Sequence, residues 1–305
     1  MRVLLTGAAG YLGHAVGRAL LLSGHEVLGL ARSDVGAKTV AAAGMSPIRG
    51  DLANEVSLVD AVADVDAVIE AASADNHDAV RVLVGLLAGS GKRYIRTSGI
   101  GIYSEPTMGA PGTRLYAEDT PFTPHDVYLA RRDSDDLAIA AAAHGVHSVV
   151  LRPGMVYGAG GSEHVPVLLH AALRDGLSRY VGDGRNQYGT VYLDDVAAGY
   201  VLALEHAPAG SVYNLSSGES TFGEIADGVA AVLGLEPAMS VSIEEAIGAL
   251  GPLYGMGIAV AARADSARAI SELGWRPIGP TLLEDLTEGS YRRVWGHRIP
   301  TVRAA

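Results

Sequence analysis

Short apolar runs alternate with longer amphipathic stretches along the first half of the chain. The runs are rich in valine, leucine and isoleucine, and each is only a few residues long. Apolar runs of this kind, separated by helical stretches, are typical of a parallel sheet that helices cover on both faces. We therefore predict a doubly wound α/β fold whose strands are Arg2–Leu5, Glu26–Leu30, Ser46–Arg49, Ala67–Glu70, Arg93–Thr97 and Ser148–Leu151.

The clearest helical stretch lies between the last two of these strands. It runs from about Pro124 to His144, with a proline in its first turn and Gly145 as a C-terminal stop. Acidic and basic residues mix on it as on a solvent-exposed helix face, at Arg131, Arg132, Asp133, Asp135 and Asp136. Beyond Gly158 the alternation weakens, so we expect the chain to leave the sheet there.

Composition and charge narrow the functional classes. The chain has 305 residues, of which 49% are hydrophobic and none is cysteine, so thiol nucleophiles, iron–sulfur clusters and disulfides are excluded. The net charge of −11 disfavours nucleic acid and anionic membranes as partners. Glycines interrupt the apolar N-terminal stretch, so we expect neither a signal peptide nor a membrane span, and a cytoplasmic location.

The segment from Thr6 to Gly13 follows the first strand directly and opens a helix. In such a segment Gly7 permits a tight turn, Gly10 lets the backbone approach a pyrophosphate, and Gly13 allows the helix to pack closely on the strand. The helix N-terminus at Tyr11 and Leu12 faces the phosphate charge. The pattern predicts a dinucleotide site, and its alternative is a tight turn of another α/β fold.

The residues at the end of the second strand indicate whether NAD or NADP is bound. An acidic residue there accepts hydrogen bonds from a ribose 2′-hydroxyl, whereas an arginine accommodates a 2′-phosphate. Here the strand is followed by Arg32 and Ser33. We therefore expect NADP rather than NAD, with Arg32 as a solvated loop residue in the alternative. The later strand ends are expected to contact the same cofactor through Asp51, Leu52, Ala71 and Ala72.

The chain resembles the extended, atypical short-chain dehydrogenases/reductases, which include the NAD-dependent epimerases and dehydratases. Beyond Thr6–Gly13, the resemblance rests on Gly50–Leu52, Thr97–Ser98 before Tyr103, Glu118–Pro121, Leu151–Gly158 and Val191–Ala197. It implies a Rossmann-like domain, a smaller C-terminal substrate-binding domain and an active site between the two. We expect the first domain to comprise residues 1–158 and 186–212, and the second residues 159–185 and 213–305.

The resemblance also implies a catalytic tyrosine, a lysine four residues later on the same helix, and a serine at the end of the preceding strand. Tyr128 matches the tyrosine, but Arg132 stands where the family has lysine. Arginine keeps the charge that holds the nicotinamide ribose and favours the tyrosinate, but it does not readily release a proton. The serine position falls on Gly99, and Ser98 is one residue early. The alternative is that Tyr128 and Arg132 are an ordinary exposed helix pair.

The remaining candidates follow from the same resemblance. Pro153 and Val156 are expected to contact the nicotinamide, and Tyr157 to face the cleft. Further substrate contacts are expected from His164, Arg185 and Tyr188, with a loop histidine and a surface ion pair as the alternatives for the first two. His144 and His147 have no carboxylate close by in the sequence, so we expect no metal site.

These features predict an NADP(H)-dependent oxidoreductase that reduces a carbonyl group, or oxidises the matching alcohol, on a small or medium organic substrate. Tyr128 is expected to move the proton, Arg132 to hold the ribose, and Ser98 to polarise the oxygen. The alternatives are an epimerase, isomerase or dehydratase with bound NAD(P), and a catalytically inactive protein that senses NADP. The alanine-rich run Ala138–Ala143 is typical of a homodimer interface in this family.

Overall fold

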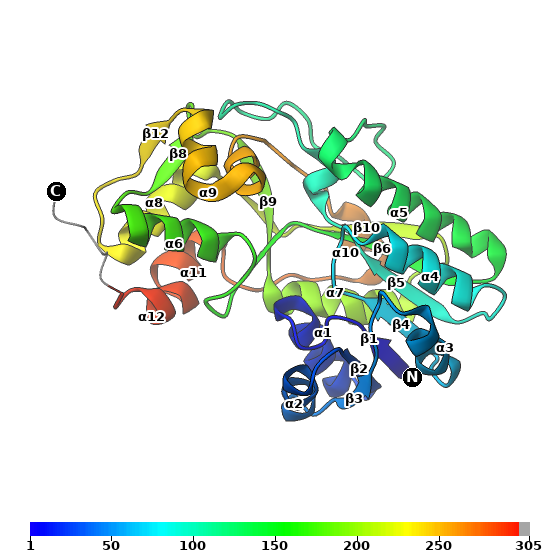
Figure 1. Cartoon of the computed structure of the whole chain (residues 1–305). Coiled ribbons are helices and arrows are strands. Elements are labelled where there is room, and N and C mark those ends of the chain that lie inside the picture. Colours follow the sequence, from blue (N-terminus) through cyan, green and yellow to red (C-terminus); the bar gives the residue numbers. More distant parts are fainter. Residues whose placement is uncertain (299–305) are drawn as a thin grey trace.

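A computed structural model describes residues 1–298 (Figure 1). Its centre is a seven-stranded sheet in which all neighbouring strands are parallel. In spatial order the strands are β10 (Ser211–Leu215), β6 (His147–Pro153), β5 (Arg93–Thr97), β4 (Ala67–Glu70), β1 (Arg2–Leu5), β2 (Glu26–Ala31) and β3 (Ser46–Arg49). The strand order reverses between β1 and β4, and the carboxyl ends of these strands form the edge where ligands bind in such sheets.

Helices cover both faces of this sheet. Apolar side chains of α1 (Tyr11–Leu22), α2 (Asp34–Ala42) and α7 (Leu193–His206) share one buried cluster with the strands. Those of α3 (Glu55–Ala63), α4 (His77–Leu87) and α5 (Leu129–Ala140) belong to a second cluster. The predicted doubly wound fold is therefore confirmed. Each predicted strand is present, and strands that are buried on both faces explain the continuous apolar runs.

The prediction of one helix from Pro124 to His144 is wrong at its beginning. A 3₁₀ turn covers Asp126–Tyr128, and α5 begins only at Leu129. His125 has extended backbone angles, and its imidazole accepts a hydrogen bond from the backbone of that turn. The helix tightens into another 3₁₀ turn at its end and stops at Gly145, whose φ is 75°, as predicted.

The remaining elements pack together beside the sheet, on the left in Figure 1. A three-stranded sheet contains β11 (Gly218–Thr221), β9 (Gln187–Tyr192) and β7 (Met155–Tyr157), and β12 (Met239–Val241) pairs with β8 (Arg179–Val181). The helices are α6 (Val165–Asp175), α8 (Phe222–Leu233), α9 (Ile243–Gly257), α11 (Leu282–Thr287) and α12 (Ser290–Trp295). They share a third buried cluster.

The expected domain boundaries do not coincide with these packing units. Residue 212 lies within β10, which belongs to the central sheet as a whole. The short helix α10 (Ala267–Leu273) and Trp275 also pack on the sheet domain, where the Trp275 indole donates to the backbone carbonyl of Asp195 at 2.8 Å. Residues 267–275 thus pack with the central sheet, although they fall within the range 213–305 expected for the second domain.

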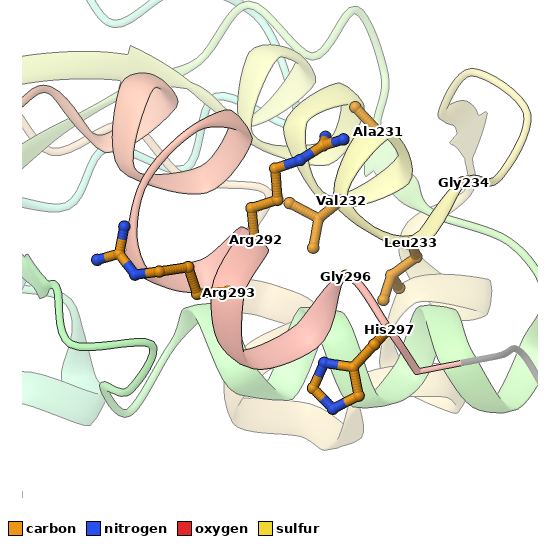
Figure 2. Close-up of a pocket in the computed structure, with 8 residues that line it drawn as sticks. All are labelled: Ala231, Val232, Leu233, Gly234, Arg292, Arg293, Gly296 and His297. Carbon is orange, nitrogen blue, oxygen red and sulfur yellow. The ribbon is translucent and has the colours of Figure 1, made fainter.

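A surface pocket of about 410 Å³ lies between the C-terminal ends of α8 and α12 (Figure 2). Arg292, Arg293 and His297 line it, together with the end of α8. None of the residues expected to bind a cofactor or substrate belongs to it. Within residues 1–298, no helix is long and apolar enough to cross a membrane.

Candidate active site

The loop between β1 and α1 is shaped by its glycines. Gly7 has φ of +69°, and an added Cβ there would lie 2.5 Å from the carbonyl oxygen of Ala71. A Cβ on Gly13 would collide with the carbonyl group of Gly7. The helix begins after Gly10 with no side-chain cap and no acidic residue in its first turn. Its backbone N–H groups therefore suit a phosphate.

The side chain of Tyr11 contacts the turn that follows β7. Its hydroxyl donates to the carbonyl oxygen of Gly158 at 2.9 Å, and its ring packs against Gly161. The side chain thus ties the glycine loop to the turn that follows β7. Burial and neighbouring acidic and phenolic groups raise the pKa of Tyr11, so it remains a hydrogen-bond donor.

The other residues expected to bind the cofactor follow the next three strands. Arg32 is exposed after β2, and the Ser33 hydroxyl caps α2 by accepting from the backbone of Gly36 at 3.1 Å. Asp51 accepts the backbone N–H of Ala53 at 3.0 Å. The backbone N–H of Ala71 donates to the Thr6 hydroxyl, whereas Leu52 packs half-buried and Ala72 is exposed.

Tyr128 ends the 3₁₀ turn before α5, and its hydroxyl lies near the segment that follows β5. An added Cβ on Gly101 would be 3.2 Å from the Tyr128 hydroxyl and 3.2 Å from the Tyr188 hydroxyl. Two phenol groups from distant segments therefore face the same point, just beyond β5. Burial raises the pKa of Tyr188, and this phenol stays protonated at neutral pH.

Arg131, and not Arg132, accompanies Tyr128. The guanidinium carbon of Arg131 is 4.9 Å from the centre of the Tyr128 ring. The Arg132 side chain instead pairs with Asp136 at 2.9 Å and lies over the ring of Phe122. Tyr128 precedes the helix, with φ of −109° and ψ of 6°, so the helical spacing of four residues does not apply to it. The spacing argument for Arg132 therefore does not hold, and its role stays a prediction.

The Ser98 hydroxyl, like the Arg132 side chain, already has a partner in the protein. Its side chain is buried, and its hydroxyl donates to the carboxylate of Asp135 at 2.9 Å. The position that opens toward Arg131 is Gly99, since an added Cβ there would be 3.3 Å from Nη1 of Arg131. The structure therefore does not support Ser98 as the group that polarises a substrate oxygen.

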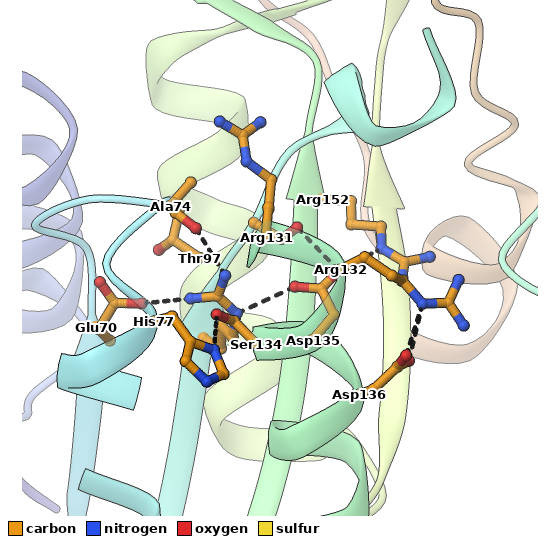
Figure 3. Close-up of polar contacts among 12 residues, drawn as sticks. Glu70, Ala74, His77, Thr97, Arg131, Arg132, Ser134, Asp135, Asp136 and Arg152 are labelled. Carbon is orange, nitrogen blue, oxygen red and sulfur yellow. Dashed lines mark hydrogen bonds and ion pairs between the residues drawn. The ribbon is translucent and has the colours of Figure 1, made fainter. Parts of the chain in front are cut away.

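A buried network of charges lies beneath these residues (Figure 3). Arg96 donates to Glu70 and to Asp135 at 3.0 Å each, and Arg152 donates to Asp135 at 3.0 Å. The four side chains are 0–3% exposed. The interpretation of Asp135 as part of a solvated face is wrong, because it joins α5 to β5 and β6. In Figure 3 the Arg131 side chain extends away from this network.

The model of the NAD-dependent epimerase/dehydratase family matches residues 3–216 of the chain. The match includes the glycine loop, all seven strands of the central sheet except the first residue of β1, Tyr128 and Arg131. The chain belongs to this family. The resemblance stated from the sequence motifs is confirmed.

Members and structural neighbours of the family differ in activity. An uncharacterized protein of Schizosaccharomyces pombe is 34% identical over 304 residues, which cover 95% of this chain and 100% of that protein. A 2-alkyl-3-oxoalkanoate reductase of Stenotrophomonas maltophilia is 33% identical over 240 residues, 72% of this chain and 71% of the reductase. The solved structure of DesIV, a dTDP-glucose 4,6-dehydratase of Streptomyces venezuelae, has a TM-score of 0.77 at 22% identity and covers 97% of each chain. This similarity shows a shared fold.

The residues expected to contact nicotinamide or substrate lie on or beside β6, β7, β9 and α6. Pro153 is buried at the end of β6, and Val156 is half-buried. Tyr157 does not face a cleft, because its hydroxyl donates to the carbonyl oxygen of Pro280 at 2.6 Å and the residue is buried. Arg185 is exposed in the turn before β9. Of the four expected substrate contacts, Tyr188 and His164 are those whose pKa the charge of Arg131 acts to lower, more weakly than burial acts on either group.

His164 is neutral in the folded protein. The ring precedes α6 and packs edge-on against Tyr254, with 5.9 Å between ring centres. Burial, followed by the charge of Arg131, lowers the pKa of His164 from 6.5 to about 4. At neutral pH the ring is therefore uncharged, and it can donate or accept a hydrogen bond to a bound molecule.

This lowered pKa predicts a pH-dependent stability. Between pH 6.5 and about 4 the unfolded chain binds a proton at His164 that the folded chain does not bind. Its contribution therefore favours folding above this range and is lost as the pH falls through it. We expect His164→Gln to reduce the slope of the unfolding free energy against pH in this range, measured by urea titrations. Equal slopes in the two proteins would contradict the lowered pKa.

Proposed function

We propose that this protein is an NADP(H)-dependent carbonyl reductase that acts on a small or medium organic ketone, or oxidises the matching alcohol. The observation that carries the proposal is the Tyr128 hydroxyl, which faces Gly101 at the carboxyl edge of the sheet with the Arg131 guanidinium beside its ring. A phenol beside a fixed cation is suited to proton transfer to a substrate oxygen.

The residues at the sheet edge fit a dinucleotide. The uncapped N-terminus of α1 offers backbone N–H groups at Tyr11 and Leu12 to a pyrophosphate, and a side chain at Gly7 would collide with Ala71. Arg32 is exposed where a 2′-phosphate would be held. Pro153 and Val156 are assigned to the nicotinamide end. When bound, the nicotinamide supplies the electron pair and hydrogen for reduction of a carbonyl carbon.

In this proposal Tyr128 donates its phenolic proton to the carbonyl oxygen as the carbonyl carbon is reduced. The phenolate that remains lies under the guanidinium of Arg131, 4.9 Å from the ring centre. Tyr188 is a second phenol donor at the same point and orients the substrate oxygen. The neutral ring of His164 adds an uncharged wall, which suits an organic ketone more than a highly charged substrate.

The relative from Stenotrophomonas supports a ketone substrate, since its name states a reductase of 2-alkyl-3-oxoalkanoates. We therefore propose a 3-oxo compound with a substituent at carbon 2 as the first substrate class to test. An esterified probe, ethyl 2-methyl-3-oxobutanoate, is stable enough for the assay. Net oxidation of NADPH with formation of the hydroxy ester supports the reductase. Isomerisation or loss of water without net NADPH oxidation, or no reaction, would contradict it.

Cofactor choice is tested by calorimetric titration with NADPH and with NADH. We expect NADPH to bind more tightly, and Arg32→Ala to weaken NADPH binding about 10–100-fold, because a charged hydrogen bond to phosphate contributes about 1.5–3 kcal/mol. The affinity for NADH should stay within about twofold in this variant. The matched control is Arg81→Ala, because Arg81 is also an exposed arginine and it pairs with Asp78. Tighter binding of NADH would overturn the role of Arg32, and binding of neither would favour an inactive protein.

A further inference from the structure

The absence of a side chain at Gly99 leaves room for the guanidinium group of Arg131. A Cβ on Gly99 would lie 3.3 Å from Nη1 of Arg131 and 3.6 Å from the carbonyl oxygen of Pro153. A separation of 3.3 Å is closer than a side chain and a guanidinium group normally approach without displacement. A side chain at position 99 would therefore have to displace the end of the Arg131 side chain by a few tenths of an ångström.

The Arg131 guanidinium is fixed but retains one free end. Nε and Nη2 each donate to a different carboxylate oxygen of Asp75 at 2.8 Å. Such a two-point contact fixes the plane of the group. Nη1 has no hydrogen-bond partner within residues 1–298, and it is the nitrogen nearest to Gly99. Its N–H groups are therefore available to a bound molecule.

The charge of this group persists although the side chain is only 15% exposed. Burial alone would lower the pKa of Arg131, but the hydrogen bonds and charge of Asp75 outweigh burial and raise it. The guanidinium therefore remains a cation next to Tyr128. A charged, fixed donor in a partly dehydrated site stabilises a developing negative charge on oxygen more than water does.

We propose that Arg131 is a catalytic residue whose Nη1 donates to the substrate carbonyl oxygen, and that Gly99 is required because it leaves room for this guanidinium. The inference rests on the proposed carbonyl reduction and adds the group that polarises the carbonyl. Arg131 takes the place of a hydroxyl donor from the end of β5, which this chain lacks because Ser98 is bound to Asp135. Tyr128 supplies the proton, and Arg131 releases none.

The test is a double-mutant cycle on Gly99→Ser, Arg131→Ala and their combination. We expect Arg131→Ala to lower kcat/KM for ethyl 2-methyl-3-oxobutanoate about 10²-fold, as is typical when one donor to a developing oxyanion is lost. Gly99→Ser alone should also lower it, because the new side chain displaces Nη1. In the Arg131→Ala protein, where the space is empty, Gly99→Ser should instead raise kcat/KM about tenfold.

A merely structural role for Arg131 predicts a different pattern. It would lower the thermal midpoint and the affinity for NADPH, and the serine would not restore activity. Arg81→Ala is the control for loss of an arginine with an acidic neighbour. Retention of kcat/KM within about twofold in Arg131→Ala, or an effect of Gly99→Ser in the same direction in both backgrounds, overturns the inference.

A binding measurement separates this inference from the proposed function. Pentane-2,4-dione forms an oxyanion and is titrated into each variant saturated with NADP⁺, so no turnover is needed. We expect Arg131→Ala to weaken its binding at least tenfold and Gly99→Ser to restore binding in that background. If the dione shows this dependence while the wild-type protein does not reduce the ester, the proposed function fails and the oxygen-binding role of Arg131 stands. If the ester is reduced but neither readout depends on Arg131, the inference fails.

Discussion

Replacement of Tyr128 by phenylalanine is expected to lower kcat for carbonyl reduction by about 10²–10⁴-fold, the range typical for removal of a positioned proton donor. The substitution keeps the ring that packs beside the Arg131 guanidinium and removes only the hydroxyl that faces Gly101. Since the glycine loop and Arg32 belong to other segments, the affinity for NADPH should change by less than about twofold. Steady-state kinetics and calorimetric titration measure the two effects.

Tyr213→Phe is the matched control for this substitution. Tyr213 lies on the outer strand β10, and its hydroxyl donates to Glu272 of α10 at 2.8 Å. Removal of this hydroxyl should therefore leave kcat unchanged. Full activity of Tyr128→Phe would remove Tyr128 from the mechanism. In that case Tyr188, the second phenol at Gly101, is the next candidate for the donor, and the loss of activity should appear in Tyr188→Phe.

Most of the central sheet could be predicted from the sequence because its strands, apart from the exposed edge strand β3, are buried on both faces. Val3 and Leu4, for example, are fully buried although neighbouring side chains of a strand point in opposite directions. Such strands are mostly apolar, and this leaves a recognisable apolar run in the sequence. The glycine positions could be predicted for a similar reason, since backbone close to Gly7 and Gly13 excludes any larger residue.

The choice between Arg131 and Arg132 could not be made from spacing. A spacing of four residues brings side chains together only within a helix, and α5 begins one residue after Tyr128. Adjacent helical residues are rotated by about 100° around the axis, so Arg131 and Arg132 point in different directions. The proline at position 124 suggested a helix beginning there, whereas the 3₁₀ turn at Asp126–Tyr128 sets the actual orientation.

The partners of buried charges were hidden for another reason. Asp135 lies between exposed charged residues in the sequence, and its two arginine partners are located on β5 and β6. Only the packing of α5 on these strands brings the three together. The arginines were the available signal, because Arg96 and Arg152 directly follow the buried apolar residues Ile95 and Leu151 within strands. A charged residue within such a strand requires a buried partner.

This network predicts the largest effect on stability. Asp135→Asn removes the negative charge between two buried cations, Arg96 and Arg152, while it keeps the size of the side chain. Loss of one partner of a buried ion pair typically costs about 3–5 kcal/mol, because the remaining charge stays buried without compensation. Domains of ordinary stability unfold with about 5–15 kcal/mol, so the variant should retain only part of its stability. Urea unfolding with an unchanged slope measures the difference.

Asp136→Asn is the matched control on the same helix. Asp136 pairs with Arg132 at the surface, with exposed fractions of 51% and 34%, and such helical pairs contribute about 0.3–0.5 kcal/mol. If Asp135→Asn does not fold, Ser98→Ala still tests the network, because it removes one hydrogen bond to Asp135 and should cost about 1 kcal/mol. Similar small losses at positions 135 and 136 would show that Asp135 is solvated. A large loss at position 135 alone would show that the buried charges hold α5, and with it Tyr128 and Arg131, at the edge of the sheet.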